Sequence, residues 1–308
     1  MTGRLHHVGP VIIDVVMAID SLPEQGGGAF AGSAHTLPGG GFNVIAAAAR
    51  TGAEVVYGGA HGTGPHGDLI RAALRAEGVE IAHSPRPEDT GFCVVLVDST
   101  AERTFVTRLG AEMDLPLEDL RTLHPSIGDS VYTVGYSLLP GPRADELVTW
   151  IRELPPEVRL VLDPAPVVGD IPTETLTSVL ARVDVLSLSA AEAAAVTGTG
   201  GPERAAALLA ERVRPTGVVV LRDSAEGCVV ATADTVPRRV PGFAVDPVDT
   251  NGAGDTHVGV FTTALASGFS TLEAARRANA ASAIAVTRRG PATSPTTEEL
   301  EGFLEKHG

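Results

Sequence analysis

The strongest constraint on the fold of this chain is the regular alternation of short apolar runs with segments of helical periodicity. The apolar runs have the length and the Val, Ile and Leu content of strands, which we expect at residues 7–16, 54–58, 130–134, 159–163, 183–188 and 217–222. The segments between them predict helices at residues 43–50, 67–77, 144–153, 173–181, 190–197, 202–213 and 255–266. Because strands that are apolar throughout are buried on both faces, the pattern predicts an α/β fold with a mostly parallel sheet between helical layers.

Two segments depart from this alternation. Residues 21–37 are rich in glycine, and residues 90–109 have the pattern of a β-hairpin, so we place insertions at about 15–38 and 90–110. We expect them to form a small antiparallel sheet over the carboxyl edge of the central sheet, where open α/β sheets bind ligands. This small sheet is either a lid or an edge hairpin without a function. Since no linker or repeat interrupts the chain, we expect residues 1–308 to form a single domain.

The charge of the chain excludes several classes of function. The sequence has 38 acidic and 23 Lys or Arg residues, a formal net charge of -15, and no basic stripe that would bind nucleic acid or an anionic membrane surface. Its only lysine is Lys306, near the end of the chain. A P-loop, a protein-kinase site and a Schiff-base site each need a lysine inside the fold, so none of them is expected.

The cysteines and the apolar segments predict where the protein functions. Cys93 and Cys228 lie in apolar runs without metal-ligand spacing, which predicts buried, reduced thiols. Asp14 interrupts the apolar stretch near the N-terminus, so we expect no signal peptide. The longest uncharged run, at residues 26–49, contains a proline and many glycines and does not predict a membrane span. We therefore expect a cytoplasmic protein.

The strongest motif for chemistry is the segment DPVDTNGAGDTHVGVFTTAL at residues 246–265. Three residues that commonly cap helices come before three small ones: Asp249, Thr250, Asn251, Gly252, Ala253 and Gly254. Asp255 then falls in the first turn of an apolar helix. Small residues at a helix N-terminus let an anion reach the backbone amides, and Asp255 beside it could accept the proton of an attacking hydroxyl. A capped helix after a glycine turn is the alternative.

Other residues suit a polyol or a metal ion. Asn43 follows a glycine run, Gly39, Gly40 and Gly41, on whose backbone a polyol could lie, although a flexible turn explains the run equally well. Asp14 ends an apolar strand, where a carboxylate can bind two sugar hydroxyls or face solvent. Glu192 could hold Mg²⁺ through water, or it could serve only as an acid at a helix N-terminus.

The segment Gly62 to Gly67 matches the dinucleotide-binding pattern G-x-G-x-x-G. Such a site also needs an acid at the end of the next strand, about 20 residues further on. Residues 81–84 carry none, and the next acids lie in a loop beyond two prolines. A turn between a strand and a helix is the better interpretation.

With these motifs in view, the chain resembles the ribokinase-like (PfkB) carbohydrate kinases. The segment DTNGAGD at residues 249–255 resembles the C-terminal signature of that family, and PGGGFNVIAAAARTG at residues 38–52 resembles the N-terminal one. Further likenesses lie at residues 102–104, 163–164, 224–227 and 278–290, so that the resemblance covers residues 9–294. It implies a three-layer α/β/α fold with a small antiparallel β lid.

The resemblance also implies ATP-dependent phosphorylation of a sugar hydroxyl, usually a primary one, with Mg²⁺. Asp255 would be the general base, and the backbone amides of residues 252–255 the anion hole. The sugar would be held by Asp14, Gly39, Gly40, Gly41 and Asn43. The nucleotide would lie by Ser189, Ser224, Gly227 and Asn279. A monovalent cation, potassium, would bind Asp249, Asn251, Ala285, Arg288, Gly290 and Ser294.

The chain departs from the family pattern at three positions. Ser189 stands where many members have the Asn of an Asn-x-x-Glu motif, Ile12 replaces a polar residue, and Pro38 precedes the glycines. The sugar is therefore not identified, and a sugar- or nucleotide-binding protein that has lost catalysis is an alternative, as is an NAD-linked oxidoreductase. The apolar strand at residues 92–97 suggests a homodimer formed through the lid.

Overall fold

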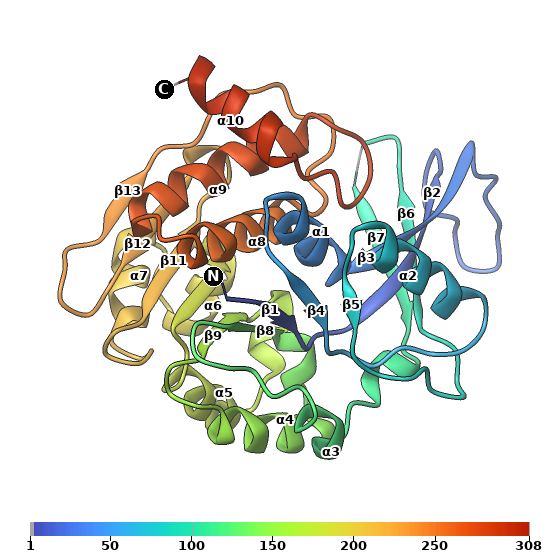
Figure 1. Ribbon diagram of the computed structural model, residues 1–308. Coiled ribbons are helices and arrows are strands. Elements are labelled where there is room, and N and C mark those ends of the chain that lie inside the picture. Colours follow the sequence, from blue (N-terminus) through green and yellow to red (C-terminus); the bar gives the residue numbers. More distant parts are fainter. Residues whose placement is uncertain (1–2, 101, 308) are drawn as a thin grey trace.

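A nine-stranded sheet runs through the middle of the molecule in a computed structural model that describes residues 3–100 and 102–307 (Figure 1). The strand order is β13-β12-β11-β10-β9-β8-β1-β4-β5. All neighbours from β11 to β5 are parallel, whereas β12 and β13 are antiparallel additions at one edge. The strands are β1 (Leu5–His7), β4 (Val55–Tyr57), β5 (Glu80–Ile81), β8 (Ser130–Val134), β9 (Arg159–Asp163), β10 (Val185–Ser189), β11 (Val218–Arg222), β12 (Cys228–Ala231) and β13 (Arg238–Val240).

Helices cover both faces of this sheet, which confirms the predicted three-layer α/β/α architecture. One face packs against α1 (Phe42–Arg50), α2 (Pro65–Ala76), α8 (Ala253–Ala266), α9 (Thr271–Val286) and α10 (Thr297–Lys306). The other packs against α3 (Leu117–Leu120), α4 (Pro142–Glu153), α5 (Thr173–Leu180), α6 (Ala190–Thr197) and α7 (Pro202–Ala210). Short 3₁₀ turns are η1 (Ala111–Met113), η2 (Gly135–Leu138), η3 (Pro166–Asp170) and η4 (Ser224–Glu226). Successive residues of β11 point to opposite faces of the sheet: Val220 packs with the core under α1 and α8, and Val219 packs with the core under α4 and α7. Because both faces are buried, the strand is apolar throughout.

A second sheet of four strands lies at one side of the molecule, on the right of Figure 1. Its order is β3-β2-β6-β7, and its strands are β2 (Val11–Ala18), β3 (Ser33–Gly40), β6 (Phe92–Val97) and β7 (Arg103–Arg108). The outer pairs are antiparallel as predicted, but the central pair, β2 with β6, is parallel. We call this sheet the lid sheet.

The prediction of one strand at residues 7–16 is wrong. The chain leaves the central sheet after His7 and enters the lid sheet at Val11, so that Asp14 lies in the lid sheet and not at the end of a central strand. Gly9 and Pro10 form the break between the two strands. Proline has no amide hydrogen, so Pro10 cannot continue the hydrogen-bond ladder of β1. Its carbonyl accepts from the amide of Gly41, 3.0 Å away, next to the start of the lid sheet.

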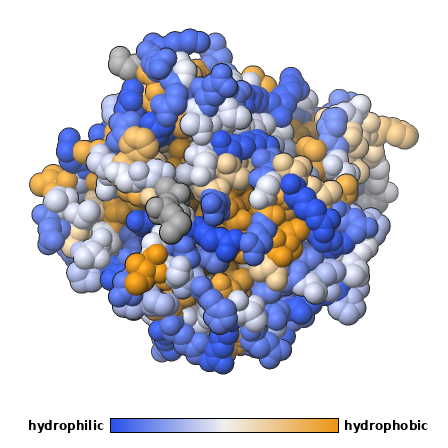
Figure 2. All heavy atoms as spheres, in the orientation of Figure 1, coloured by the Kyte–Doolittle hydropathy of each residue, from blue (hydrophilic) through white to orange (hydrophobic). Residues whose placement is uncertain are grey.

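Several elements were not predicted as such. Strands β5, β12 and β13 are too short to give a clear apolar run. The alanine-rich α9 and the terminal α10 follow one another without a strand between them, so they lie outside the alternation of strands and helices. Cys93 and Cys228 are buried and free, as expected. The face in Figure 2 is mostly hydrophilic, with smaller apolar areas. Within the described residues, no helix combines the length and the apolar character needed to cross a bilayer.

Candidate active site

Helix α8 begins without a side-chain cap. Its N-cap is Gly252, in the left-handed region with φ 73°, and no side chain accepts a hydrogen bond from its first turn. The amide of Ala253 donates to the carbonyl of Thr250 over a long 3.4 Å, and within the described residues the amides of Gly254 and Asp255 have no acceptor. The capping alternative is therefore wrong, and the positive end of the helix dipole is open to a ligand.

The carboxylate of Asp255 is oriented by Asn43 of α1. The Asn43 Nδ2 donates to Asp255 Oδ2 over 2.9 Å, and Asn43 Oδ1 accepts from the amide of Ala292 over 2.9 Å. A Cβ on Gly252 would lie 3.3 Å from the Asn43 Cγ, so a glycine lets the turn approach this amide closely. Asn43 thus joins α1, α8 and the loop after α9 at a single point.

A second carboxylate, Asp14 of the lid sheet, lies near the first. Burial raises the pKa of Asp255 to about 6, against the opposing effects of the hydrogen bond from Asn43 and the charge of Arg222. Burial also raises the pKa of Asp14 to about 6, together with the charge of Asp255. A Cβ on Gly39 would meet the Asp14 Oδ2 at 2.1 Å, so the backbone of the glycine run lies directly against this carboxylate.

Arg222, to which the sequence analysis assigned no role, lies under the start of α8. It is the last residue of β11, and its Nη1 donates to Asp163 Oδ2 over 2.8 Å and to Ser187 Oγ over 2.7 Å. The only sequence signal was a basic residue at the end of an apolar strand, which resembles an ordinary surface position. Here its side chain is only 14% exposed.

Ser189 and Glu192 form a capping box at the start of α6. Ser189 Oγ accepts from the amide of Glu192 over 3.2 Å, and Glu192 Oε2 accepts from the amide of Ser189 over 2.7 Å. Glu192 Oε2 also lies 3.6 Å from Arg222 Nη2. Among the described residues, Glu192 Oε1 has no hydrogen-bond partner, so one oxygen of this largely buried carboxylate remains available.

Two of the residues expected at the nucleotide, Gly227 and Asn279, lie against the segment that follows β13. Asn279 Nδ2 donates to the carbonyls of Val240 and Pro241, each 3.0 Å away, and its Oδ1 lies 3.0 Å from His257 Nε2. A Cβ on Gly227 would meet the carbonyl of Val240 at 2.2 Å. Asn279 therefore supports the backbone here, while Ser224, in η4, is exposed.

The residues expected to bind a monovalent cation come together in the loops beside α8. Asp249 Oδ2 accepts from the amide of Gly290 over 3.0 Å, and its Oδ1 accepts from the amide of Asn251 over 2.9 Å and from Arg103 of β7. The carbonyl of Ala285 accepts from the amide of Arg288 over 3.1 Å. Both carboxylate oxygens of Asp249 are thus already engaged.

Arg50 also holds the loop between α9 and α10, in which Ser294 lies. Arg50 Nη1 of α1 donates to the carbonyl of Ser294 over 3.2 Å and lies 3.5 Å from its Oγ. Among residues 3–100 and 102–307, no donor contacts the carbonyl oxygens of Asn251, Arg288 and Gly290. These three backbone oxygens are therefore without a protein donor in the described part of the chain.

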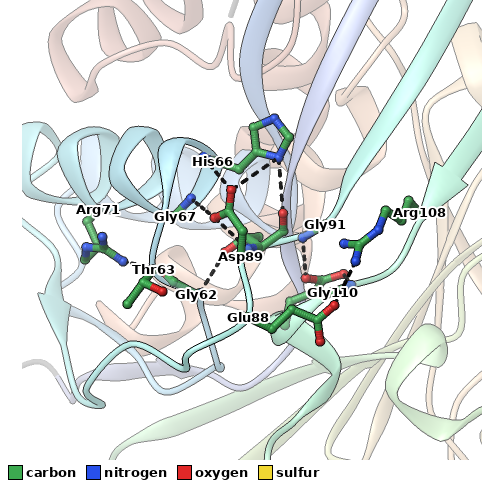
Figure 3. Close-up of polar contacts among 12 residues, drawn as sticks. Gly62, Thr63, His66, Gly67, Arg71, Glu88, Asp89, Gly91, Arg108 and Gly110 are labelled. Carbon is green, nitrogen blue, oxygen red and sulfur yellow. Dashed lines mark hydrogen bonds and ion pairs between the residues drawn. The ribbon is translucent and has the colours of Figure 1, made fainter.

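The dinucleotide-like motif forms a closed turn (Figure 3). The carboxylate of Asp89 accepts from the amide of Gly67 over 2.9 Å and from the amide of His66 over 3.1 Å. A carboxylate of the chain itself therefore occupies the N-terminus of α2, where a pyrophosphate would bind. A Cβ on Gly62 would meet the carbonyl of Glu88 at 2.1 Å, and this close packing accounts for the glycine.

A hollow of about 350 Å³ lies elsewhere, between η3, α5 and α6. It is lined by side chains of the outer helical layer, including Leu176, Val196 and Arg212, and by none of the residues expected at the site. We place the site by the convergence of Asp14, Asp255 and the open end of α8, not by this hollow.

Removing the charge of Asp255 should stabilise the protein near neutral pH. The folded protein holds this proton more tightly than the unfolded chain, whose Asp has a pKa of 3.8, so ionisation destabilises the fold as pH rises through about 6. We expect Asp255→Asn to raise the free energy of unfolding at about pH 8 by up to ~3 kcal/mol and to change it little below pH 3.8. Denaturant unfolding at both pH values measures this, with the exposed Asp234→Asn as control. A loss of stability at the higher pH would contradict it.

Comparison with known proteins agrees with this geometry. The model of the pfkB family carbohydrate kinases matches residues 4–298. An uncharacterized sugar kinase of Escherichia coli K12 is 31% identical over 306 residues, 95% of this chain and 91% of that protein. The ribokinase of Haemophilus influenzae is 31% identical over 271 residues, 86% of each chain.

Solved structures show the same fold. The ribokinase of Thermotoga maritima superposes with a TM-score of 0.84 at 25% identity, over 98% of this chain and 99% of that one. The Arabidopsis thaliana ribokinase complexed with ribose and ATP gives a TM-score of 0.81 at 24% identity, over 99% of each chain. The family match spans almost the whole chain, and this protein therefore belongs to the pfkB family of carbohydrate kinases.

Proposed function

We propose that this carbohydrate kinase transfers the γ-phosphoryl group of ATP to a primary hydroxyl of a sugar, with Asp255 as the general base. The observation that supports this most strongly is the pairing of the uncapped N-terminus of α8 with the carboxylate of Asp255, which lies in the first turn of the same helix. Phosphoryl transfer needs mainly positioning and charge stabilisation, and this pairing supplies a proton acceptor and anion donors together.

Asp255 accepts the proton as the acceptor oxygen attacks the γ-phosphorus. The new O–P bond forms, the bond between the γ-phosphorus and the β,γ-bridging oxygen breaks, and ADP leaves. A pKa of about 6 keeps Asp255 ionised at neutral pH, and yet makes it a stronger base than an exposed aspartate. The hydrogen bond from Asn43 leaves the second carboxylate oxygen, Oδ1, to face the hydroxyl.

The open amides of α8 are proposed as the anion hole for the moving phosphoryl group. The amides of Gly254 and Asp255 have no acceptor within the described residues, and those of Gly252 and Ala253 complete the turn. Their dipoles are fixed before the reaction and do not have to reorganise as charge develops. The absence of side chains at Gly252 and Gly254 keeps the approach clear.

The sugar is proposed to lie between the lid sheet and α1. Asp14 would bind hydroxyls, and the backbone of Gly39, Gly40 and Gly41 would form the floor on which the sugar rests, beside Asn43. Tyr136 of η2 lies close enough to Asp255 for the charge of that carboxylate to add to the effect of burial, and both raise the pKa of the Tyr136 phenol. Together with Ile12 it would give the pocket an apolar side, which suits a ring face of the sugar.

The nucleotide is proposed to lie by Ser189, Ser224 and Gly227, with Asn279 acting through the backbone that it supports. No group of three His, Cys, Asp or Glu side chains that could hold a metal is found in the described part of the chain. This fits Mg²⁺, which commonly keeps several waters and binds through one carboxylate and the phosphates. Glu192, with its unpartnered Oε1, would hold the ion through water, and the ion would neutralise phosphate charge.

An assay of ATP consumption over a panel of sugars and nucleosides tests the proposal. We expect turnover with at least one sugar, and a fall in kcat/KM as pH drops through about 6, because Asp255 must be ionised. Asp255→Asn should reduce turnover by about 10²–10⁴-fold without loss of folding, and Asp234→Asn should not. Ligand binding without any turnover would favour the rival hypothesis, a binding protein that has lost catalysis. Ser189 in place of asparagine is the feature that supports that rival.

We propose that potassium binds the loops beside α8 through the carbonyls of Asn251, Arg288 and Gly290, with Asp249, Ala285 and Ser294 around it. Since the segment with Asp249 and Asn251 leads directly into Gly252, a bound ion would order the anion hole. We expect turnover to be higher in potassium than in tetramethylammonium, which is too large for the site. Equal turnover in the two salts at matched ionic strength would reject this site.

We propose a homodimer formed through the lid sheet. Strand β7 is an edge of that sheet, and it exposes 59% of Phe105 and 61% of Val106. An exposed apolar edge strand favours pairing with a second copy. Light scattering should show a dimer, and Phe105→Glu should convert it to a monomer. A wild-type monomer at all concentrations would contradict the proposal.

A further inference from the structure

Arg222 carries the clearest chemistry that the proposed function leaves unused. Its guanidinium lies among three carboxylates, since it bonds to Asp163, lies 3.6 Å from Glu192 and is close enough to Asp255 to lower the pKa of that group. A polyphosphate approaching the open end of α8 would meet this acidic cluster. Without Arg222, the cluster would repel it.

The two edges of the guanidinium differ. Nη1 is committed, because it donates to both Asp163 and Ser187. Nε has no hydrogen-bond acceptor within the described residues, and Nη2 has only the 3.6 Å contact with Glu192. The second edge, formed by Nε and Nη2, is therefore free to donate.

This free edge lies against the anion hole. A Cβ on Gly254 would lie 3.3 Å from Cζ, 3.4 Å from Nε and 3.5 Å from Nη2 of Arg222. Nε and Nη2 thus lie next to Gly254, whose amide is one of those without an acceptor at the start of α8 within the described residues. Nε and Nη2 form the planar fork with which arginine binds two oxygens of a phosphate.

We propose that Arg222 is a catalytic residue that binds phosphate oxygens of the nucleotide through Nε and Nη2, as a fixed cation beside the amides of Gly254 and Asp255. This inference rests on the proposed kinase function and adds a phosphate ligand to it. Asp163 and Ser187 hold the other edge, so the fork is oriented before the nucleotide arrives. In a chain whose only lysine is Lys306, an arginine is the cation available for this role.

The capping box at α6 explains why such a cation is useful here. Ser189 stands where the family pattern commonly has asparagine, and its Oγ accepts from the amide of Glu192. A serine side chain used in this way reaches less far toward the phosphates than an asparagine. Arg222, on the adjacent strand of the sheet, supplies donors on the same side.

The rival interpretation is that Arg222 only ties together the ends of β9, β10 and β11 through Asp163, Ser187 and Glu192. Both interpretations predict that its loss harms the enzyme, so activity alone does not separate them. They differ in the ligand whose affinity changes: loss of a phosphate contact weakens the binding of ATP and of inorganic tripolyphosphate, but not that of adenosine. A strand tie affects all three ligands through the fold.

Calorimetric titration with ATP, tripolyphosphate and adenosine, each in the presence of Mg²⁺, separates them. We expect Arg222→Gln to weaken the binding of ATP and tripolyphosphate by roughly 10- to 100-fold and to leave adenosine binding unchanged. Arg222→Lys keeps the charge but loses the fork, so we expect an intermediate loss in a folded protein. Arg182→Gln is the matched control, because Arg182 is 18% exposed and pairs with Asp184 before the start of β10, at the other end of the strand.

Equal affinity of wild type and both Arg222 variants for ATP would overturn the inference. So would a loss that is equally large for adenosine, since it would mark a purely structural role. If Arg222→Gln fails to fold, the comparison of wild type with Arg222→Lys decides in the same way. Failure of the wild-type protein to bind ATP at all would instead contradict the proposed function.

Discussion

The open N-terminus of α8 is the constraint around which the site is arranged. Helix α6 is closed at its N-terminus by the side chain of Ser189, whereas α8 begins at a left-handed glycine, and the amides of Gly254 and Asp255 have no acceptor within the described residues. Such an end is stabilised by a negative charge. Asp255 lies in this first turn, and its carboxylate accepts a hydrogen bond from Asn43 and none from the amides of the turn within the described residues.

The site needs both sheets, and the break at Gly9 and Pro10 is what brings them together. The central sheet delivers strand ends, so that Asp163 and Arg222 meet below α8. The lid sheet delivers Asp14, whose carboxylate lies against Gly39 on the neighbouring strand. Because the chain passes directly from one sheet to the other, only three residues separate β1 of the central sheet from β2, the strand that carries Asp14.

The alternation of apolar and helical segments was sufficient to predict the layers, since that pattern follows directly from burial on both faces of a parallel sheet. It did not reveal the break after His7, because Val8 and the apolar residues of β2 that follow Pro10 form what looks like one run in the sequence. The sequence also left a capped start of α8 as an alternative, which the structure does not bear out. Asp249 is a common cap residue, but its carboxylate is taken by Gly290 and Arg103, which are distant in sequence. Long-range partners of this kind leave no local signal.

The balance of charge explains how so acidic a chain can receive a polyphosphate. Asp163, Glu192 and Asp255 lie near one another, and the fixed dipoles of α8 and the guanidinium of Arg222 are the opposing charges within the described chain. Burial adds to this balance: it weakens the screening by water, so each fixed donor acts more strongly on a nearby phosphate than the net charge of the surface does. In the proposed site, local geometry would therefore outweigh the overall charge of -15, and the same burial that raises the pKa of Asp255 would also strengthen the action of the neighbouring amides on an anion.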